Sequence, residues 1–138
     1  MATSKSSKPN PNPPRPTDAE LAILRVLWRL GPSTVRQVHE ALEEGGAQAT
    51  VYTTVLKLMQ IMTEKGLAER DESQRTHIYR SAYPEERTQQ QLVDDLLERA
   101  FGGSARKLAM QALSSEKASA EELAEIRELL DRLGGDES

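Results

Sequence analysis

Residues 49–66 read ATVYTTVLKLMQIMTEKG and form the longest amphipathic segment in the first two thirds of the chain. Its apolar residues recur at spacings of three and four, which is the period of an amphipathic helix. They are Val51, Val55, Leu58 and Met62, widened by Leu56, Met59 and Ile61. Thr50 or Thr53 is the expected N-terminal cap, and Gly66 is the left-handed residue expected to end the helix. We therefore predict a helix over 49–65 with one face in a core.

The opposite face of this helix is polar. It carries short hydroxyls and flexible polar groups, with no acid until Glu64. Hydroxyl, amide and ammonium groups are the ones that reach phosphates and base edges in protein–DNA complexes. This face therefore suits contact with DNA through Thr50, Tyr52, Thr53, Thr54, Lys57 and Gln60.

Two shorter helices precede this one. Thr17 followed by Glu20 has the spacing of a capping box, which predicts a helix over 18–30 that a Gly-Pro pair then ends. Ser33 or Thr34 caps a second helix. Two short helices and a longer third one give the layout of a helix-turn-helix, whose last helix lies in the major groove.

The third helix is followed by two predicted strands, 67–70 and 76–81, joined by a polar turn. A hairpin in this place makes the domain a winged helix. Its tip can lie along the sugar-phosphate backbone, where Gln74, Arg75 and His77 would be donors.

The C-terminal part, residues 84–138, predicts three amphipathic helices separated by glycine and serine signals. Helices this short cannot enclose their own apolar stripes, and a two-fold dimer is the commonest way to bury them. The residues expected at the dimer interface are Leu92, Leu96, Leu97, Phe101, Leu108, Leu123, Ile126, Leu129 and Leu130.

Charge is distributed unevenly along the chain. The net charge of −4 is made of +3 in residues 1–16, −1 in 17–83 and −6 in 84–138. The first segment is rich in Pro, Ser, Asn and Lys and has almost no apolar residue, so we expect it to be disordered. The sequence thus predicts a mainly α protein with a disordered basic arm (1–16), a winged-helix DNA-binding domain (17–83) and a helical dimerisation domain (84–138).

Several function classes find little support. The chain has no cysteine and two isolated histidines, which argues against thiol chemistry and metal sites. The signals for a nucleophile with a base or a carboxylate pair are weak, and no glycine-rich phosphate loop follows a predicted strand. We expect no catalytic residue, metal, cofactor or small-molecule substrate. The absence of a long apolar run predicts a soluble cytoplasmic protein. A DNA-binding regulator and a winged-helix protein-interaction module that binds no DNA both remain open.

Three segments resemble a known family. Residues 21–36 (LAILRVLWRLGPSTVR), 51–55 (VYTTV) and 64–67 (EKGL) are similar to the BlaI/MecI/CopY penicillinase-repressor family of winged-helix transcriptional regulators. The resemblance extends over about residues 17–133. It implies a homodimeric repressor on a palindromic double-stranded operator. It also implies a membrane sensor metalloprotease as a partner, whose signal leads to cleavage in the dimerisation domain and release of the operator.

The resemblance carries over unevenly by position. Ile61 stands where the family often has Arg, and Gln111-Ala112 stand where an Asn-Phe pair marks the family's cleavage site. The C-terminal cysteines of the copper-responsive branch are absent, which argues against copper sensing. The residue pattern and the family resemblance together predict ten DNA-binding residues: Thr34, Arg36, Thr50, Tyr52, Thr53, Thr54, Lys57, Gln60, Arg75 and His77.

Overall fold

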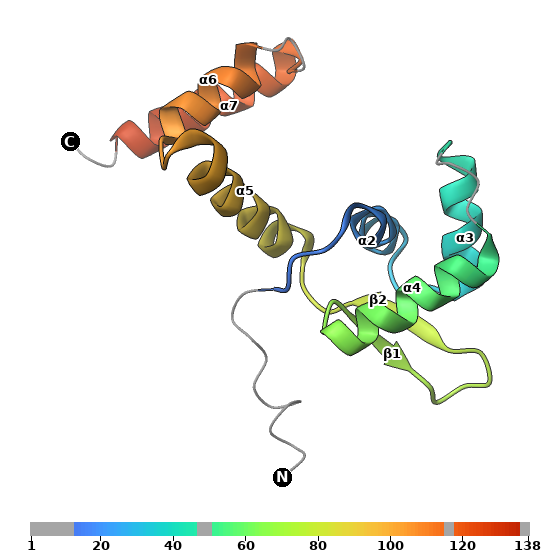
Figure 1. The fold of residues 1–138 in the computed structure, drawn as a ribbon. Helices are drawn as coiled ribbons and strands as arrows, with labels where there is room; N and C mark the ends of the chain where they lie inside the picture. The colour runs from blue at the N-terminus through green and yellow to red at the C-terminus, as the bar shows by residue number, and fades with distance from the viewer. Residues whose placement is uncertain (1–12, 47–50, 115–117, 136–138) are drawn as a thin grey trace. The chain divides into compact units, whose positions relative to one another are not determined.

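The computed structural model describes residues 13–46, 51–114 and 118–135, which form helices and one two-stranded antiparallel sheet (Figure 1). This confirms the predicted mainly α fold.

The chain divides into two compact units, Met1–Val93 and Asp94–Ser138. No helix in the described ranges is both long and apolar enough to cross a bilayer. Most of the predicted arm lies outside the described residues, but its last part is described, and Pro13 and Pro16 are buried there. The elements are α2 (Asp18–Leu30), α3 (Val35–Glu44), α4 (Tyr52–Lys65), β1 (Ala68–Asp71), β2 (Ile78–Ser81), α5 (Glu85–Phe101), α6 (Ala105–Ser114) and α7 (Ala120–Gly135).

Helices α2 and α3 both begin with a capping box. The Thr17 hydroxyl accepts a hydrogen bond from the Glu20 amide, and the Glu20 carboxylate accepts one from the Thr17 amide. These reciprocal bonds satisfy two of the free donors at the helix start, so α2 has its predicted bounds. Thr34, and not Ser33, caps α3, with Gln37 as its partner.

Helix α4 begins at Tyr52, later than predicted. Its N-cap is Val51, which makes no side-chain capping bond. The predicted cap at Thr53 is wrong because this residue lies inside the first turn; Thr50 lies outside the described residues. The other end is as predicted, since Gly66 takes the left-handed conformation with φ of 90°.

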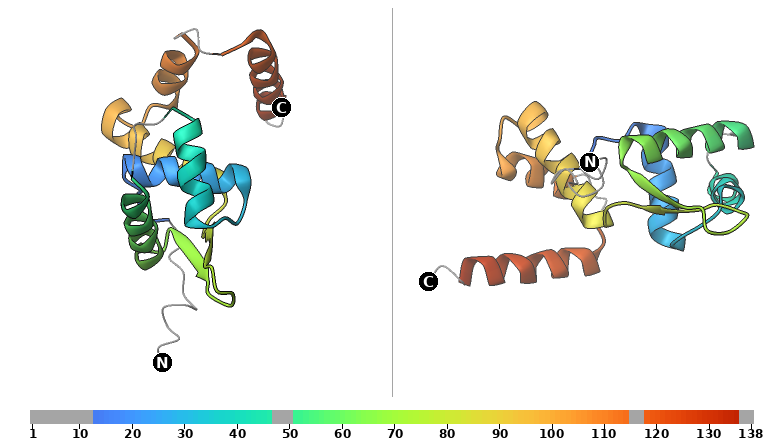
Figure 2. Two further views of the ribbon diagram at one scale, coloured as in Figure 1. Left: turned by 90° about the vertical axis from the view of Figure 1, so that its right-hand side faces the viewer. Right: turned by 90° about the horizontal axis from the view of Figure 1, so that it is seen from below.

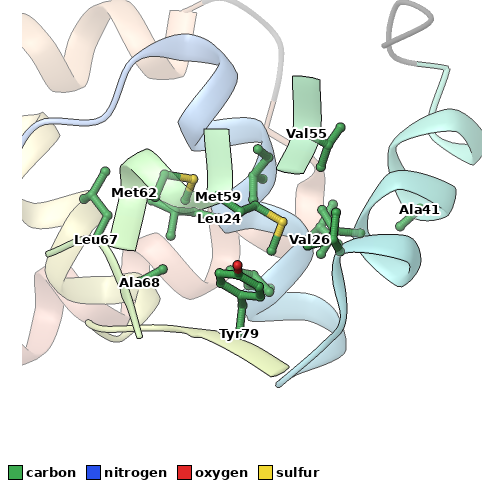
Figure 3. Close-up of a cluster of buried hydrophobic side chains, with 13 residues drawn as sticks. Leu24, Val26, Ala41, Val55, Met59, Met62, Leu67, Ala68 and Tyr79 are labelled. Carbon is green, nitrogen blue, oxygen red and sulfur yellow. The ribbon is translucent and has the colours of Figure 1, made fainter. Parts of the chain in front are cut away.

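The core of the first unit is shared by its helices and the hairpin (Figure 3). Helix α4 contributes Val55, Met59 and Met62. Four of the seven predicted apolar residues differ: Leu56, Leu58 and Ile61 are only partly buried, and Val51 is 62% exposed. Val51 precedes the first helical residue, so the helical period does not place it on the buried face. The buried apolar residues are Ile23, Leu24, Val26, Leu27, Val35, Val38, Ala41, Val55, Met59, Met62, Leu67, Ala68 and Tyr79.

The hairpin runs back beside α4, with its loop at the same end as the N-terminus of that helix (Figures 1 and 2). Strand β1 is shifted by one residue from its prediction, and β2 begins two residues later than predicted. The two strands pair with Arg70 opposite Tyr79. Tyr79 also exchanges two backbone hydrogen bonds with Ser33, at 2.8 and 2.9 Å. The hairpin is therefore tied to the connection between α2 and α3.

The second unit contains the end of α5 together with α6 and α7. None of the residues described in α6 and α7 is buried. Large apolar side chains are exposed on all three helices, an arrangement that isolated soluble proteins rarely keep. In this unit they are Leu96, Met110, Leu113, Leu123, Leu129, Leu130 and Leu133.

Candidate nucleic-acid interface

A groove of about 490 Å³ lies between the N-terminal ends of α3 and α4 and the loop of the hairpin. Half of the predicted DNA-binding residues line it: Thr34, Arg36, Tyr52, Arg75 and His77. Thr76 lines it as well, a residue that sequence reasoning missed, and Val35, Leu56 and Tyr79 complete the lining. None of the described lining residues is acidic, so the two arginines give the groove a positive charge suited to phosphate.

Tyr52 is held in place at the start of α4. The His39 ring meets its ring edge-on, with centroids 5.9 Å apart and planes at 83°. The Arg36 guanidinium lies 6.0 Å from the Tyr52 ring centroid, within reach of a cation–π interaction. His39 is thus a second residue that the sequence did not assign to this site. Its contact with Tyr52 depends on how α3 crosses α4, which no local pattern encodes.

The remaining predicted side chains on α4 lie outside the groove, on the exposed surface of the helix. They are Thr53, Thr54, Lys57 and Gln60. Their side chains make no hydrogen bond or ion pair with any other described residue, so they are available to a ligand. The last of the ten predicted residues, Thr50, lies outside the described part of the chain.

The two acids where β1 meets the hairpin loop, Asp71 and Glu72, are engaged by local contacts. Glu72 pairs with Arg70, with an oxygen 2.5 Å from a guanidinium nitrogen. The Asp71 carboxylate accepts a hydrogen bond of 2.9 Å from the Ser73 amide, and this bond holds the pKa of Asp71 below its usual range. Arg75 makes no such contact with another described residue, so its charge remains available at the end of the groove.

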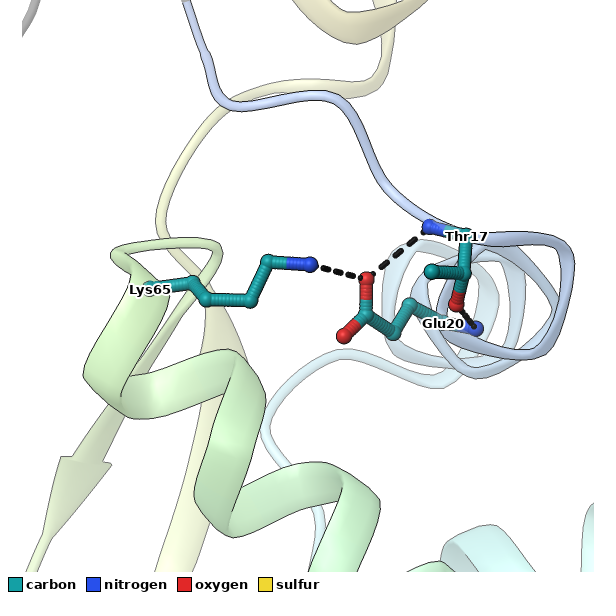
Figure 4. A network of polar contacts seen from close by, with 3 residues as sticks. All are labelled: Thr17, Glu20 and Lys65. Atoms are coloured by element: carbon teal, nitrogen blue, oxygen red, sulfur yellow. Dashed lines mark hydrogen bonds and ion pairs between the residues drawn. The ribbon is translucent and has the colours of Figure 1, made fainter.

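The far end of α4 is fastened to α2 (Figure 4). The Lys65 ammonium lies 2.7 Å from a carboxylate oxygen of Glu20, and the same oxygen accepts the Thr17 amide at 2.9 Å. Glu20 is only 2% exposed. Burial alone would raise the pKa of Glu20, but the hydrogen bonds from Lys65 and Thr17 outweigh it and keep this pKa lowered. Of the two lysines on α4, therefore, Lys65 is paired, and Lys57 has no ion-pair partner among the residues that the structure describes.

Three helices followed by a hairpin that returns beside the third helix define a winged helix-turn-helix domain. In this class the third helix enters the major groove of DNA. The cationic groove lies at the N-terminal end of α4, the third helix of this domain.

Comparison with known proteins gives the family. The family model described as "Penicillinase repressor" matches residues 16–132. The chain is 32% identical over 117 residues to the "Transcriptional regulator BlaI" of two Mycobacterium tuberculosis strains, CDC 1551/Oshkosh and ATCC 25618/H37Rv. Each match spans 84% of this chain and 83% of the relative. The chain belongs to the penicillinase repressor family, whose members are transcriptional regulators and not enzymes. This confirms the resemblance and favours DNA binding over the interaction-module alternative.

Proposed function

We propose that this transcriptional repressor binds a palindromic operator as a homodimer, with α4 in the major groove and the hairpin along the phosphate backbone. The groove shared by Arg36, Tyr52 and Arg75 supports this most directly, because it joins both helices of the helix-turn-helix to the wing. An acid-free, arginine-lined surface is the electrostatic signature of a nucleic-acid site, even in a chain with a net charge of −4.

Within this proposal the side chains have different tasks. Arg36, Arg75 and His77 contact phosphates and set the register on the duplex. The exposed side chains of Tyr52, Thr53 and Thr54 at the start of α4 meet base edges. Thr50, which precedes them in the sequence, has the same task. Lys57 and Gln60 extend the contact along the helix. Thr34 acts through its capping box, which fixes the first turn of α3 beside Arg36.

The dimer forms through the C-terminal helices, residues 84–138. Their exposed leucines, Leu129 and Leu130 among them, supply the apolar surface. Two half-sites bound by one dimer gain from effective concentration, so operator affinity depends on an interface that does not touch DNA. Anything that loosens this interface releases the operator.

The proposed inducing event is proteolysis in the cytoplasm, linked to a membrane sensor metalloprotease as the family resemblance implies. Cleavage within the dimerisation domain would interrupt the interface between copies. The bond between Gln111 and Ala112 is not the one proposed, because these residues replace the Asn-Phe pair of the family's cleavage site.

The proposal is tested by fluorescence anisotropy with DNA from upstream of the protein's own gene, measured across a salt series. We expect tight binding that a scrambled fragment of equal length does not reproduce and that weakens steeply with salt. The matched variant Arg36→Ala/Arg75→Ala should bind weakly while its dimer persists in ultracentrifugation. Salt-insensitive or non-selective binding by an intact wild-type dimer would overturn the proposal.

A further inference from the structure

Val51 is an aliphatic residue in an unusual place. It is the N-cap of α4, a position that favours Ser, Thr, Asp or Asn because their side chains accept a helix amide. Its backbone carbonyl accepts hydrogen bonds from the amides of Thr54 and Val55, at 3.0 and 3.2 Å, so its backbone is fixed to the first turn. Its side chain is 62% exposed and takes no part in the core. The side chain of Val51 therefore neither caps the helix with a hydrogen bond nor packs in the core.

The surroundings of Val51 indicate what it could contact. The first residues of a recognition helix are those that reach base edges. At this end of α4 the following exposed side chains, Thr53 and Thr54, carry hydroxyls, and Tyr52 is engaged by His39 and Arg36. Among the described residues at this end, Val51 supplies the exposed aliphatic surface.

The major groove offers one apolar feature to such a side chain. Guanine, cytosine and adenine present donors and acceptors there, whereas thymine also presents its C5-methyl group. We propose that Val51 is a specificity-determining residue whose methyl groups contact a thymine C5-methyl in each half-site. This inference rests on the proposed operator binding and names one feature of the DNA that is read.

Removing one buried methyl contact weakens binding about fourfold, so a two-fold dimer that loses one in each half-site loses about sixteenfold. The contact has two partners that can be truncated separately. Val51→Ala shortens the protein side, and deoxyuridine in place of thymidine removes the DNA methyl while keeping every hydrogen-bonding group. Coupling between the two changes identifies the contact.

The experiment scans the promoter fragment selected by the wild-type protein, replacing its thymidines with deoxyuridine one symmetric pair at a time. At one symmetric pair, we expect deoxyuridine to lower the affinity of the wild-type protein about sixteenfold. The same replacement should not lower the affinity of Val51→Ala, which already lacks the contact. Leu30→Ala is the matched control. Leu30 is 47% exposed on α2, so this variant should respond to every deoxyuridine as the wild-type protein does.

Two results would overturn the inference. One is a Val51→Ala variant that binds the thymidine operator as tightly as the wild-type protein. The other is a loss of operator affinity caused by Val51→Ala that has the same size on every deoxyuridine fragment as on the thymidine operator. Thermal unfolding of each variant shows that the fold is retained, which is expected because Val51 is exposed. A wild-type protein that selects no promoter fragment would instead refute the proposed function itself.

Discussion

The indole N–H of Trp28 donates hydrogen bonds to the hydroxyl of Ser81, at 2.9 Å, and to the backbone carbonyl of Tyr83, at 3.1 Å. Trp28 belongs to α2, whereas Ser81 ends β2 and Tyr83 lies just before α5. The Ser81 hydroxyl also donates to the Tyr83 carbonyl. One aromatic side chain thus fixes the segment through which the chain leaves the winged helix.

Trp28→Phe should destabilise the winged helix by about 1–2 kcal/mol, because it removes the indole donor from two partly buried acceptors. Urea unfolding followed by circular dichroism measures this loss. Ser81→Ala is the comparison. It leaves the indole its bond to the Tyr83 carbonyl but removes the bonds of the hydroxyl with Trp28 and Tyr83, so it should be destabilising as well. Equal urea midpoints for Trp28→Phe and the wild-type protein would contradict the prediction.

Glu20→Gln should remove a pH-dependent part of stability. Glutamine keeps the capping box with Thr17 but leaves Lys65 without its counterion. The cost should be about 1–2 kcal/mol at neutral pH, less than for a fully buried pair, because the Lys65 side chain is 34% exposed.

The direction of this pH dependence follows from the lowered pKa of Glu20. Its carboxylate stabilises the fold fully above the ordinary pKa of 4.5, and this contribution is lost as the pH falls through the lower pKa of the folded state. The difference between the wild-type protein and Glu20→Gln, measured by urea unfolding, should therefore shrink below pH 4.5. A difference that stays constant down to acid pH would refute the assignment.

Lys57→Ala and Lys65→Ala form a matched pair on α4. Lys57 has no ion-pair partner in the described part of the chain, so it can contact a phosphate. Its loss should lower the magnitude of the slope of log K against log salt concentration by about 0.9 per half-site. Lys65 is paired with Glu20, so its loss should leave that slope unchanged. Anisotropy across a salt series separates the two. The reverse order of slopes would place Lys65, and not Lys57, against phosphate.

Val51→Ser should stabilise α4, since serine supplies the side-chain cap that the helix lacks. The expected gain is about 1 kcal/mol, measured by urea unfolding. Val51→Ala, which neither caps nor packs, is the control and should gain little. An unchanged unfolding midpoint for Val51→Ser would show that the first turn is already satisfied.

Leu129→Asp places a charge on the exposed apolar surface of α7. If that surface forms the dimer, ultracentrifugation should show monomers, and operator affinity should fall at least tenfold because effective concentration is lost. The neighbouring polar change Glu128→Gln should leave both unaltered. A Leu129→Asp dimer with full affinity would exclude α7 from the interface.

The sequence predicts helix ends well where the signal is chemical and local. The capping box at Thr17 and the left-handed Gly66 both hold in the structure. Prediction by period fails at Val51, because the stripe continues into a residue that precedes the helix and takes an extended conformation. Tyr79 is the buried residue of β2. Its burial could not be predicted from the sequence, because it depends on the pairing with Arg70 and on the backbone bonds to Ser33.

The candidate site likewise has one part that the sequence predicts and another that depends on how the elements pack. The residue types on α4 indicate polar contact with DNA, so its exposed side chains could be named in advance. The groove that joins Thr34, Tyr52 and Arg75 could not, because it exists only when the hairpin folds back beside α4. The His39 contact with Tyr52 is of the same kind, since it requires two helices to cross.

The turn between α4 and the hairpin also sets a rule for redesign. Gly66 reverses the chain, the buried Leu67 follows at once, and the Leu67 carbonyl accepts a hydrogen bond from the Ala82 amide at the far end of the hairpin. The hydrogen bond therefore joins the end of the hairpin to the residue that follows α4, so the helix and the hairpin form one structural unit. A graft intended to transfer operator preference to another repressor should exchange residues 51–82 as a single cassette, because a transplanted helix alone would leave behind the wing that shares its groove.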